Sequence, residues 1–310
     1  MTTIADRLRG IHAATIVPMT EAYAVDEAQL AAHIAAVSRV PGIRGLLVNG
    51  HAGENFVLTS AEKWRVVEIA RSVAPDDCLI CSGVNAESSL VAVEDARAAE
   101  EAGADILLVF PPNAFALPHD PGAVILHHDI IAAGSTLPLL VYGAPVGAGH
   151  MAYGPDVMTA LAANPRFVGI KEGSWEVAAY EQNLRLLKTM RPDFVVMGSG
   201  DEHLLTSYII GSAGSQVSLA AVAPELCAAF FMAADAGNWQ EARRLHERIY
   251  PLAVAIYRDA PGGRATARLK ACLQLLGRQP NAVVRPPQPP VTAAETAALA
   301  AALRAAEILC

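Results

Sequence analysis

The chain has 310 residues, 53% of them hydrophobic, which is enough for a sizeable core in one large domain or two ordinary ones. Its formal net charge of -8 at pH 7 argues against general affinity for nucleic acid. No uncharged apolar run reaches the roughly 18 residues of a membrane span, and residues 1–10 lack the apolar core of a signal peptide, so we expect no membrane association and a cytoplasmic protein.

Short apolar runs, which we interpret as buried strands, alternate along the chain with longer segments of helical character. The expected strands are 12–18, 43–49, 78–83, 105–110, 137–142, 167–171, 194–198 and 215–219. The expected helices are 26–40, 60–73, 88–102, 121–133, 155–163, 176–190, 202–210 and 224–236. Thr59 and Glu62 have the spacing of a capping box, which supports a helix start at residue 60.

Eight strands alternating with eight helices favour an α/β fold of the (β/α)8 TIM-barrel type over an open doubly wound sheet. No G-x-G-x-x-G follows the first strand, so nothing supports a dinucleotide-binding fold. We expect the barrel to occupy residues 1–237 and residues 238–310 to form C-terminal helices packed on it. A second small domain is the alternative, although three helices make a poor core alone. These helices are expected at about 239–258, 261–276 and 292–308.

One expected strand ends in a lysine. The apolar run at 167–170 leads directly into Lys171, whereas Lys63, Lys188 and Lys270 fall in helical segments, where a solvated ammonium is the default. Burial of an ammonium lowers its pKa, and a neutral amine can attack a ketone to form a Schiff base. The alternative is a lysine that extends from the strand end to solvent.

In a parallel barrel the active site forms at the carboxyl ends of the strands. After the second strand, Gly50 and Gly53 permit a tight turn whose N–H groups could face a carboxylate, although an ordinary turn would use the same glycines. His51 could act as acid or base or bind a substrate oxygen, or could have no special role. Tyr142 ends the fifth strand and could relay a proton, or could simply cap the barrel.

The remaining polar groups point to structural roles. Cys78 and Cys81 are spaced like a redox or metal pair, but positions i and i+3 of a strand face opposite sides, so we interpret both as core residues. Glu54 and Glu172 are expected to brace loop backbones. No cluster has the spacing of metal ligands, and we expect no metal site and no cofactor.

The ordered strand ends resemble those of the dihydrodipicolinate synthase / N-acetylneuraminate lyase family of Schiff-base class I aldolases. Residues 50–54 (GHAGE) are similar to the family's G-x-x-G-E loop, and residues 141–145 (VYGAP) to its Y-N-x-P segment. Residues 169–172 (GIKE) are similar to its G-x-K-(E/D) strand end, and 200–202 (GDE) and 214–218 (GSQVS) to its later turns. The resemblance covers nearly the whole chain.

This resemblance implies that Lys171 forms an imine with pyruvate or another 2-oxo acid and that Tyr142 is the proton-transfer phenol. It implies a set of residues that receives the substrate: Gly50, His51, Ala52, Gly53 and Val217. It also implies a homotetramer, built as a dimer of dimers.

Departures from the family pattern bear on the second substrate. Family members often carry Thr or Ser at both middle positions of the first loop, where this chain has His51 and Ala52. Gly143 stands where an asparagine is usual. Residues 112–115 lack the tyrosine that completes a hydroxyl relay in the synthases, and Gly147 stands near the place of their arginine for the aldehyde's carboxylate. We therefore expect an aldolase rather than a true dihydrodipicolinate synthase.

The expected function is that of a class I lyase that cleaves or condenses at a pyruvate-type 2-oxo acid, with His51 contacting the part that varies between substrates. A dehydratase or deaminase of a 3-deoxy-2-oxo acid would use the same imine and stays open. A regulator that binds a 2-oxo acid without turnover is the non-enzyme alternative, and the presence of both Lys171 and Tyr142 weighs against it.

Overall fold

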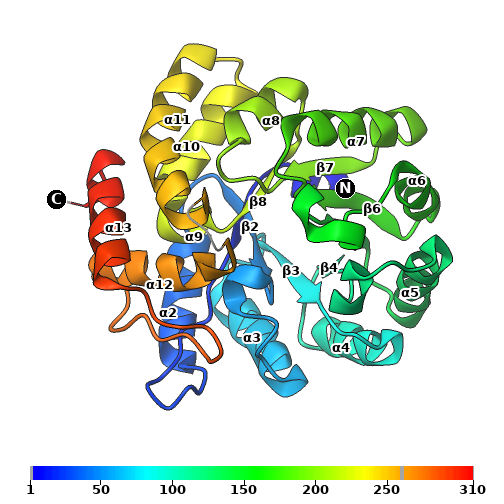
Figure 1. The fold of residues 1–310 in the computed structure, drawn as a ribbon, viewed down its shortest axis with the longest axis horizontal. Coiled ribbons are helices and arrows are strands. Elements are labelled where there is room, and N and C mark those ends of the chain that lie inside the picture. The colour runs from blue at the N-terminus through cyan, green and yellow to red at the C-terminus, as the bar shows by residue number, and fades with distance from the viewer. Residues whose placement is uncertain (1–2, 259–261, 310) are drawn as a thin grey trace.

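The computed structural model describes residues 3–258 and 262–309. Eight parallel strands pair in chain order, and β8 pairs with β1, so the sheet closes into a barrel with helices around it (Figure 1). The expectation of a (β/α)8 barrel is thus confirmed. The strands are β1 (Gly10–Ala14), β2 (Ile43–Val48), β3 (Leu79–Val84), β4 (Ile106–Val109), β5 (Leu139–Gly143), β6 (Phe167–Glu172), β7 (Val195–Gly198) and β8 (Gly214–Val217).

Eight of the helices around the barrel follow the expected order, and the short helices α1 (Ile4–Leu8) and α9 (Leu219–Val222) were not predicted. The eight are α2 (Glu27–Ser38), α3 (Ser60–Val73), α4 (Ser89–Glu101), α5 (Pro121–Gly134), α6 (Pro155–Ala163), α7 (Val177–Met190), α8 (Leu204–Ile210) and α10 (Pro224–Asp235). Three 3-10 turns lie in loops after strands: η1 (His51–Gly53), η2 (Asn113–Ala116) and η3 (Val146–Met151). Thr59 and Glu62 form the predicted capping box at the start of α3.

Most element ends agree with the sequence to within a few residues, and the first strand shows why they differ. We expected a strand at 12–18, but β1 ends at Ala14. Ile16, Val17 and Met19 beyond it are as fully buried as the strand itself. Apolar character continues because this segment packs into the core after leaving the sheet, so hydropathy alone cannot mark where the strand stops.

After α10 the chain continues in α11 (Trp239–Ala253), the π-helical turn η4 (Val254–Arg258), the 3-10 turn η5 (Gly262–Arg264), α12 (Ala265–Leu275) and α13 (Ala293–Ala305). The C-terminal helical extension is therefore present, although the expected helix start at residue 261 lies outside the described residues. Helix α12 contacts both η1 and α9, which places C-terminal residues against the barrel mouth (Figure 1). A domain boundary at residue 237 stays a prediction.

Buried side chains include both members of the Cys78–Cys81 pair. Burial raises the pKa of the Cys78 thiol to about 11 and that of Cys81 to about 12, so both stay protonated at neutral pH. The interpretation as core residues is confirmed. Within the described residues no helix is long and apolar enough to cross a membrane, and no group of three or more His, Cys, Asp or Glu could hold a metal ion.

Candidate active site

A cavity of about 620 Å3 opens at the carboxyl ends of the strands. Every strand contributes a wall residue at or just past its end. These residues are Ala14, His51, Asn85, Pro111, Tyr142, Lys171, Ser199 and Gln216. The location is the one at which barrels of this type carry their active sites.

Lys171 extends from β6 into this cavity, and its register partner on β5 is Tyr142. Because register partners on neighbouring strands face the same side, the two side chains lie together, with Lys171 Nζ 5.8 Å from the centre of the Tyr142 ring. Burial lowers the pKa of Lys171 to about 8, and the nearby Asp201 carboxylate opposes this shift. The neutral, nucleophilic amine is therefore accessible close to neutral pH.

Asp201 lies in the turn after β7 and is 3% exposed. Its Oδ1 accepts a hydrogen bond of 3.0 Å from the N–H of Leu219. Burial raises the pKa of Asp201 to about 7, while that hydrogen bond and the charge of Lys171 act in the opposite direction. Asp201 is thus the acidic group that tunes the charge on Lys171.

Tyr142 is 7% exposed, and its ring packs 4.5 Å from that of Phe110. Burial raises the pKa of its phenol, so the hydroxyl is a proton donor at neutral pH. A side chain at Gly173 would come within 2.7 Å of the Gly143 carbonyl and 3.8 Å of the Tyr142 hydroxyl. Glycine at 173 therefore permits the close approach of the backbone to the Gly143 carbonyl, next to Tyr142.

The turn after β2 presents only part of its backbone to the cavity. The N–H of Gly53 donates to the Gly50 carbonyl at 3.0 Å, and the N–H of Glu54 donates to the His51 carbonyl at 3.0 Å. Among the described residues, the N–H groups of His51 and Ala52 have no acceptor. This turn can therefore offer a carboxylate the N–H groups of His51 and Ala52, while the N–H of Gly53 already donates to the Gly50 carbonyl.

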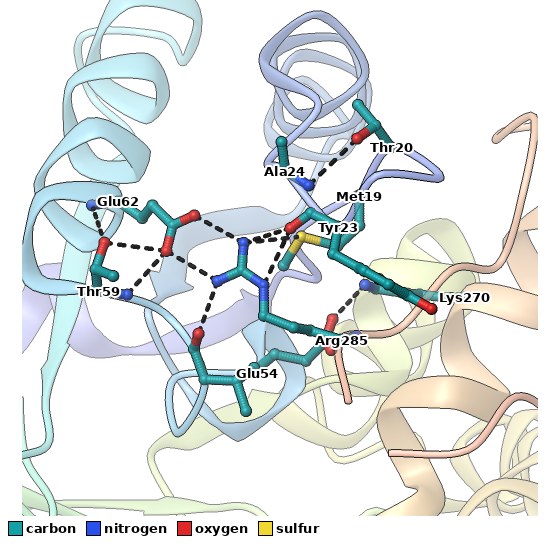
Figure 2. A network of polar contacts seen from close by, with 10 residues as sticks. Met19, Thr20, Tyr23, Ala24, Glu54, Thr59, Glu62, Lys270 and Arg285 are labelled. Atoms are coloured by element: carbon teal, nitrogen blue, oxygen red, sulfur yellow. Dashed lines mark hydrogen bonds and ion pairs between the residues drawn. The ribbon is translucent and has the colours of Figure 1, made fainter. Parts of the chain in front are cut away.

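Glu54 fastens this turn to the C-terminal part of the chain (Figure 2). Its Oε1 accepts a 2.8 Å hydrogen bond from the N–H of Arg285, and its Oε2 forms an ion pair with Lys270 of α12. Thr266 of α12 adds a 3.1 Å hydrogen bond from its hydroxyl to the His51 carbonyl. The C-terminal segment thereby fixes the loop that we expect to bind substrate, and Glu54 braces the backbone as expected.

Two lysines depart from the expectation of a solvated ammonium. Lys270 is 1% exposed and pairs with Glu54, and Lys63 is 7% exposed, with its Nζ 2.9 Å from the Asn85 carbonyl and 3.5 Å from Asp95 Oδ2. The expectation was wrong because both helices pack against the barrel with these side chains inward. In each case a buried carboxylate compensates the ammonium.

Glu172 braces the loop after β6, as expected. Its carboxylate accepts hydrogen bonds from the N–H and hydroxyl of Ser174 at 3.2 and 3.0 Å and from Asn183 Nδ2 at 3.0 Å. With these three hydrogen bonds the Glu172 carboxylate holds the loop after β6 against α7.

His51 lines the cavity within a group of rings. Its ring stacks on Phe56 at 4.7 Å, lies 4.6 Å from Phe110 and meets the Tyr142 ring nearly edge-on at 5.2 Å. Removal of water by the surrounding rings, with a smaller contribution from the charge of Lys171, lowers the pKa of His51, while part of the side chain stays exposed at the cavity opening. The imidazole is therefore neutral at physiological pH and lies next to the phenol.

The departures from the family pattern lie at different places. A Cβ on Gly143 would point at Ile170 Cδ1, 3.2 Å away, so this position faces away from the cavity. Gly147 belongs to η3, whose cavity-lining residues are the uncharged Ala148 and Met151.

Three of the residues expected to receive the substrate do not line the cavity. Val217 is buried in β8, and Gly50 and Gly53 are also absent from the cavity wall.

The only cations among the described residues that line the cavity are Lys171 and Arg285. Arg285 is already engaged, because its guanidinium donates to Glu62 at 2.7 Å and to the carbonyls of Tyr23 and Val57 at 2.6 and 2.7 Å (Figure 2). The cavity therefore presents no uncommitted arginine to a second carboxylate.

Gln216 is a cavity residue to which we assigned no role from the sequence. It is 1% exposed, and apart from an interaction with the Cys81 thiol its side-chain amide has no hydrogen-bond partner among the described residues. The expected strand at 215–219 also contains Ser215 and Ser218, so no feature of the sequence singled out Gln216. Buried amides are normally paired, so this one is available to a ligand.

Comparison with known proteins identifies relatives along the whole chain. A model of the dihydrodipicolinate synthetase family matches residues 7–306. The 4-hydroxy-tetrahydrodipicolinate synthase 1 of Streptomyces coelicolor is 35% identical over 261 residues, covering 84% of this chain and 82% of that protein. The 4-hydroxy-tetrahydrodipicolinate synthase of Rhizobium meliloti is 31% identical over 303 residues, covering 97% and 99%.

Solved structures agree with this relationship. The dihydrodipicolinate synthase of Agrobacterium tumefaciens superposes with a TM-score of 0.89 at 27% identity, covering 98% of this chain and 100% of that one. A prophage protein of E. coli K12 from the same family, solved in complex with pyruvate, shares the fold with a TM-score of 0.89 at 22% identity, covering 97% and 99%.

Proposed function

The chain belongs to the dihydrodipicolinate synthetase family, and on this premise we propose that it is an aldolase rather than a true dihydrodipicolinate synthase, with Lys171 as its Schiff-base residue. The family places it among the class I lyases that act on pyruvate through an imine. The observation that carries the assignment to these residues is the pairing of Lys171, with its lowered pKa, and Tyr142 side by side at the cavity floor.

In the proposed reaction, the neutral amine of Lys171 attacks C2 of pyruvate to give a carbinolamine, which loses water to form a protonated imine. The carboxylate is held by the free N–H groups of the turn at His51 and Ala52. Tyr142 protonates the hydroxyl that leaves the carbinolamine as water, and the phenolate that remains takes a proton from C3 to give the enamine, while the protonated imine accepts the electron pair. The enamine carbon then bonds to the aldehyde carbon, and hydrolysis of the new imine releases the product and Lys171.

Tyr142 is the group that moves protons in this cycle. Its raised pKa keeps the phenol protonated, so it can donate to the aldehyde oxygen as that oxygen gains charge and can recover the proton afterwards. His51, neutral and 5.2 Å from the Tyr142 ring centre, takes the position at which relatives often carry a hydroxyl residue. It is placed to contact the second substrate.

Among the described residues that line the cavity, no cation is free to pair with a second carboxylate of the substrate, and this supports an aldolase over a synthase. Aspartate semialdehyde carries a carboxylate that would enter a wall of uncharged residues at η3, while Arg285 is already paired with Glu62. An uncompensated buried carboxylate is costly. We therefore propose an aldehyde partner without a second carboxylate.

The test is a panel of carbonyl compounds assayed for consumption or release of pyruvate. It includes aspartate semialdehyde, uncharged aldehydes, N-acetylneuraminate and 3-deoxy-2-oxo sugar acids. The proposal predicts that aspartate semialdehyde is among the poorest partners, and condensation as efficient as that of the best member would contradict it. Loss of water or ammonia from a 3-deoxy-2-oxo acid, without pyruvate release, would instead identify a dehydratase or deaminase.

A homotetrameric assembly and a cytoplasmic location complete the proposal, and both rest on the family relationship. Sedimentation velocity at micromolar concentration tests the assembly. A single species with the mass of a tetramer is expected, and a monomer at all concentrations would contradict it.

A further inference from the structure

We infer that the aldehyde partner is an uncharged aromatic aldehyde, whose ring stacks on a wall of aromatic side chains that leads from the cavity opening to Lys171. This inference rests on the proposed function, because it concerns the second substrate of the same cavity. It goes further by naming the chemical class of that substrate.

The first observation is a continuous series of rings. Phe56 stacks on His51 at 4.7 Å with an interplanar angle of 26°, and His51 lies 4.6 Å from Phe110. Phe110 lies 4.5 Å from Tyr142, whose ring centre is 5.8 Å from Lys171 Nζ. Phe56, at one end of the series, is 54% exposed, and Tyr142, at the other end, is 7% exposed. The series therefore connects the outside of the cavity to the Lys171 amine.

Within this series, Phe56, His51 and Tyr142 line the cavity, while Phe110 is fully buried behind them. Phe56 is 54% exposed and lines the cavity, so its ring is open to a substrate that enters. His51 contributes a flat, uncharged ring, since its lowered pKa keeps the imidazole neutral. The rings thus offer faces and edges at the separations of 4.5–7 Å that aromatic pairs prefer.

A second pair of rings lines the same cavity. Trp175 lies between β6 and α7, and its ring centre is 5.5 Å from that of Tyr257 in η4. Tyr257 is fixed by a 2.6 Å hydrogen bond between its hydroxyl and Ser218 Oγ. Trp175 has φ of 58°, a left-handed conformation that is uncommon for residues other than glycine. The backbone therefore holds the indole in place at some conformational cost.

The charges around the cavity disfavour one other class of aldehyde. An anionic aldehyde would meet Asp201, while the two lining cations are committed: Lys171 to the imine and Arg285 to Glu62. Polar side chains such as Asn85, Asn113 and Gln288 line part of the cavity, and another part of its wall is apolar. This apolar wall is formed by Pro145, Ala148, Met151 and Leu269. A cavity of about 620 Å3 also leaves ample space beside a three-carbon acid.

The experiment compares benzaldehyde with cyclohexanecarboxaldehyde, which has a six-membered ring but no aromatic face, as partners for pyruvate. Since the two aldehydes differ in intrinsic reactivity, the measured quantity is the change in kcat/KM on substitution Phe56→Leu. Loss of one aromatic contact should lower kcat/KM for benzaldehyde by about two- to tenfold, and should change the value for cyclohexanecarboxaldehyde by less than about twofold. Trp175→Leu, which keeps the backbone strain and removes the ring, should give the same selective loss.

Phe115→Leu is the matched control. Phe115 lies in η2, where its ring stacks on His119 at 4.5 Å and does not line the cavity. This variant should leave both aldehydes unchanged. If Phe56→Leu and Trp175→Leu lower both aldehydes equally, or neither, the aromatic assignment is overturned.

Trapping of pyruvate with borohydride, measured on each variant, separates this inference from the proposed function. Normal trapping in Phe56→Leu together with a selective loss for benzaldehyde supports both. Normal trapping without any selective loss overturns the aromatic partner and leaves the Schiff-base lyase standing. Failure of the wild-type protein to trap pyruvate overturns the proposed function itself.

Discussion

The carboxylate of Glu54 and the ammonium of Lys270 form an ion pair in which the side chains are 6% and 1% exposed (Figure 2). Glu54 belongs to the turn after β2 and Lys270 to α12, 216 residues further along the chain. The pair therefore makes the C-terminal helices part of the support of the turn after β2.

Replacement Lys270→Met should destabilise the protein strongly, because it leaves the Glu54 carboxylate buried and uncompensated. The expected loss in free energy of unfolding is about 3–5 kcal/mol, measured by urea denaturation. The double variant Glu54→Gln/Lys270→Met should recover part of this loss, since it removes both charges. Arg244→Met, which breaks an exposed pair with Glu241, is the control and should cost less than about 0.5 kcal/mol. Equal effects of Lys270→Met and Arg244→Met would contradict the structural role of the buried pair.

The pH dependence of imine formation should follow Lys171. Because its pKa is lowered to about 8, the rate of borohydride-trapped pyruvate incorporation should rise as the ammonium loses its proton, with a midpoint near pH 8. Asp201→Asn removes a negative charge that stabilises the ammonium, so the midpoint should move to lower pH. Asp193→Asn removes an exposed carboxylate outside the cavity and should leave the midpoint in place. A midpoint near that of an ordinary lysine, or no shift in Asp201→Asn, would contradict this prediction.

Replacement Tyr142→Phe should lower the turnover number by about 10²–10⁴, the usual contribution of a general acid or base. The ring stays against Phe110, so packing is conserved and only the hydroxyl is lost. Pyruvate trapping on Lys171 should survive, though more slowly. Turnover near that of the wild type would reduce Tyr142 to a packing residue.

The side-chain amide of Gln216 should contribute to binding at the pyruvate end of the cavity. Gln216→Met has a similar length and no hydrogen-bonding amide, so it should raise the KM for pyruvate by about two- to tenfold, the value of one neutral hydrogen bond, with a smaller effect on kcat. Gln216→Glu tests whether a donor is needed, because an ionised carboxylate would repel the substrate's carboxylate. Unchanged KM values in both variants would show that the amide does not meet the substrate.

Features that depend on short stretches of the chain, such as the order of strands and helices, were predicted correctly from the sequence. The alternation of strands and helices specified the barrel, and a lysine at a strand end placed Lys171 at the mouth, with Tyr142 beside it. The burial of Lys270 could not be read in the same way, because it depends on Glu54 from a distant segment. The neighbours of His51 were missed for a similar reason, since His51 meets Phe110 of another strand end only in the folded chain.

The most direct test of the account is to identify the residue that forms the imine. Incubation of the wild-type protein with pyruvate and borohydride should add one pyruvate-derived mass to the intact chain, and a peptide map should place it on Lys171. The Lys171→Ala variant should take up none, while Lys188→Ala, which removes a lysine outside the cavity, should be labelled like the wild type. Labelling at any other residue, or no labelling of the wild-type protein, would contradict the Schiff-base mechanism.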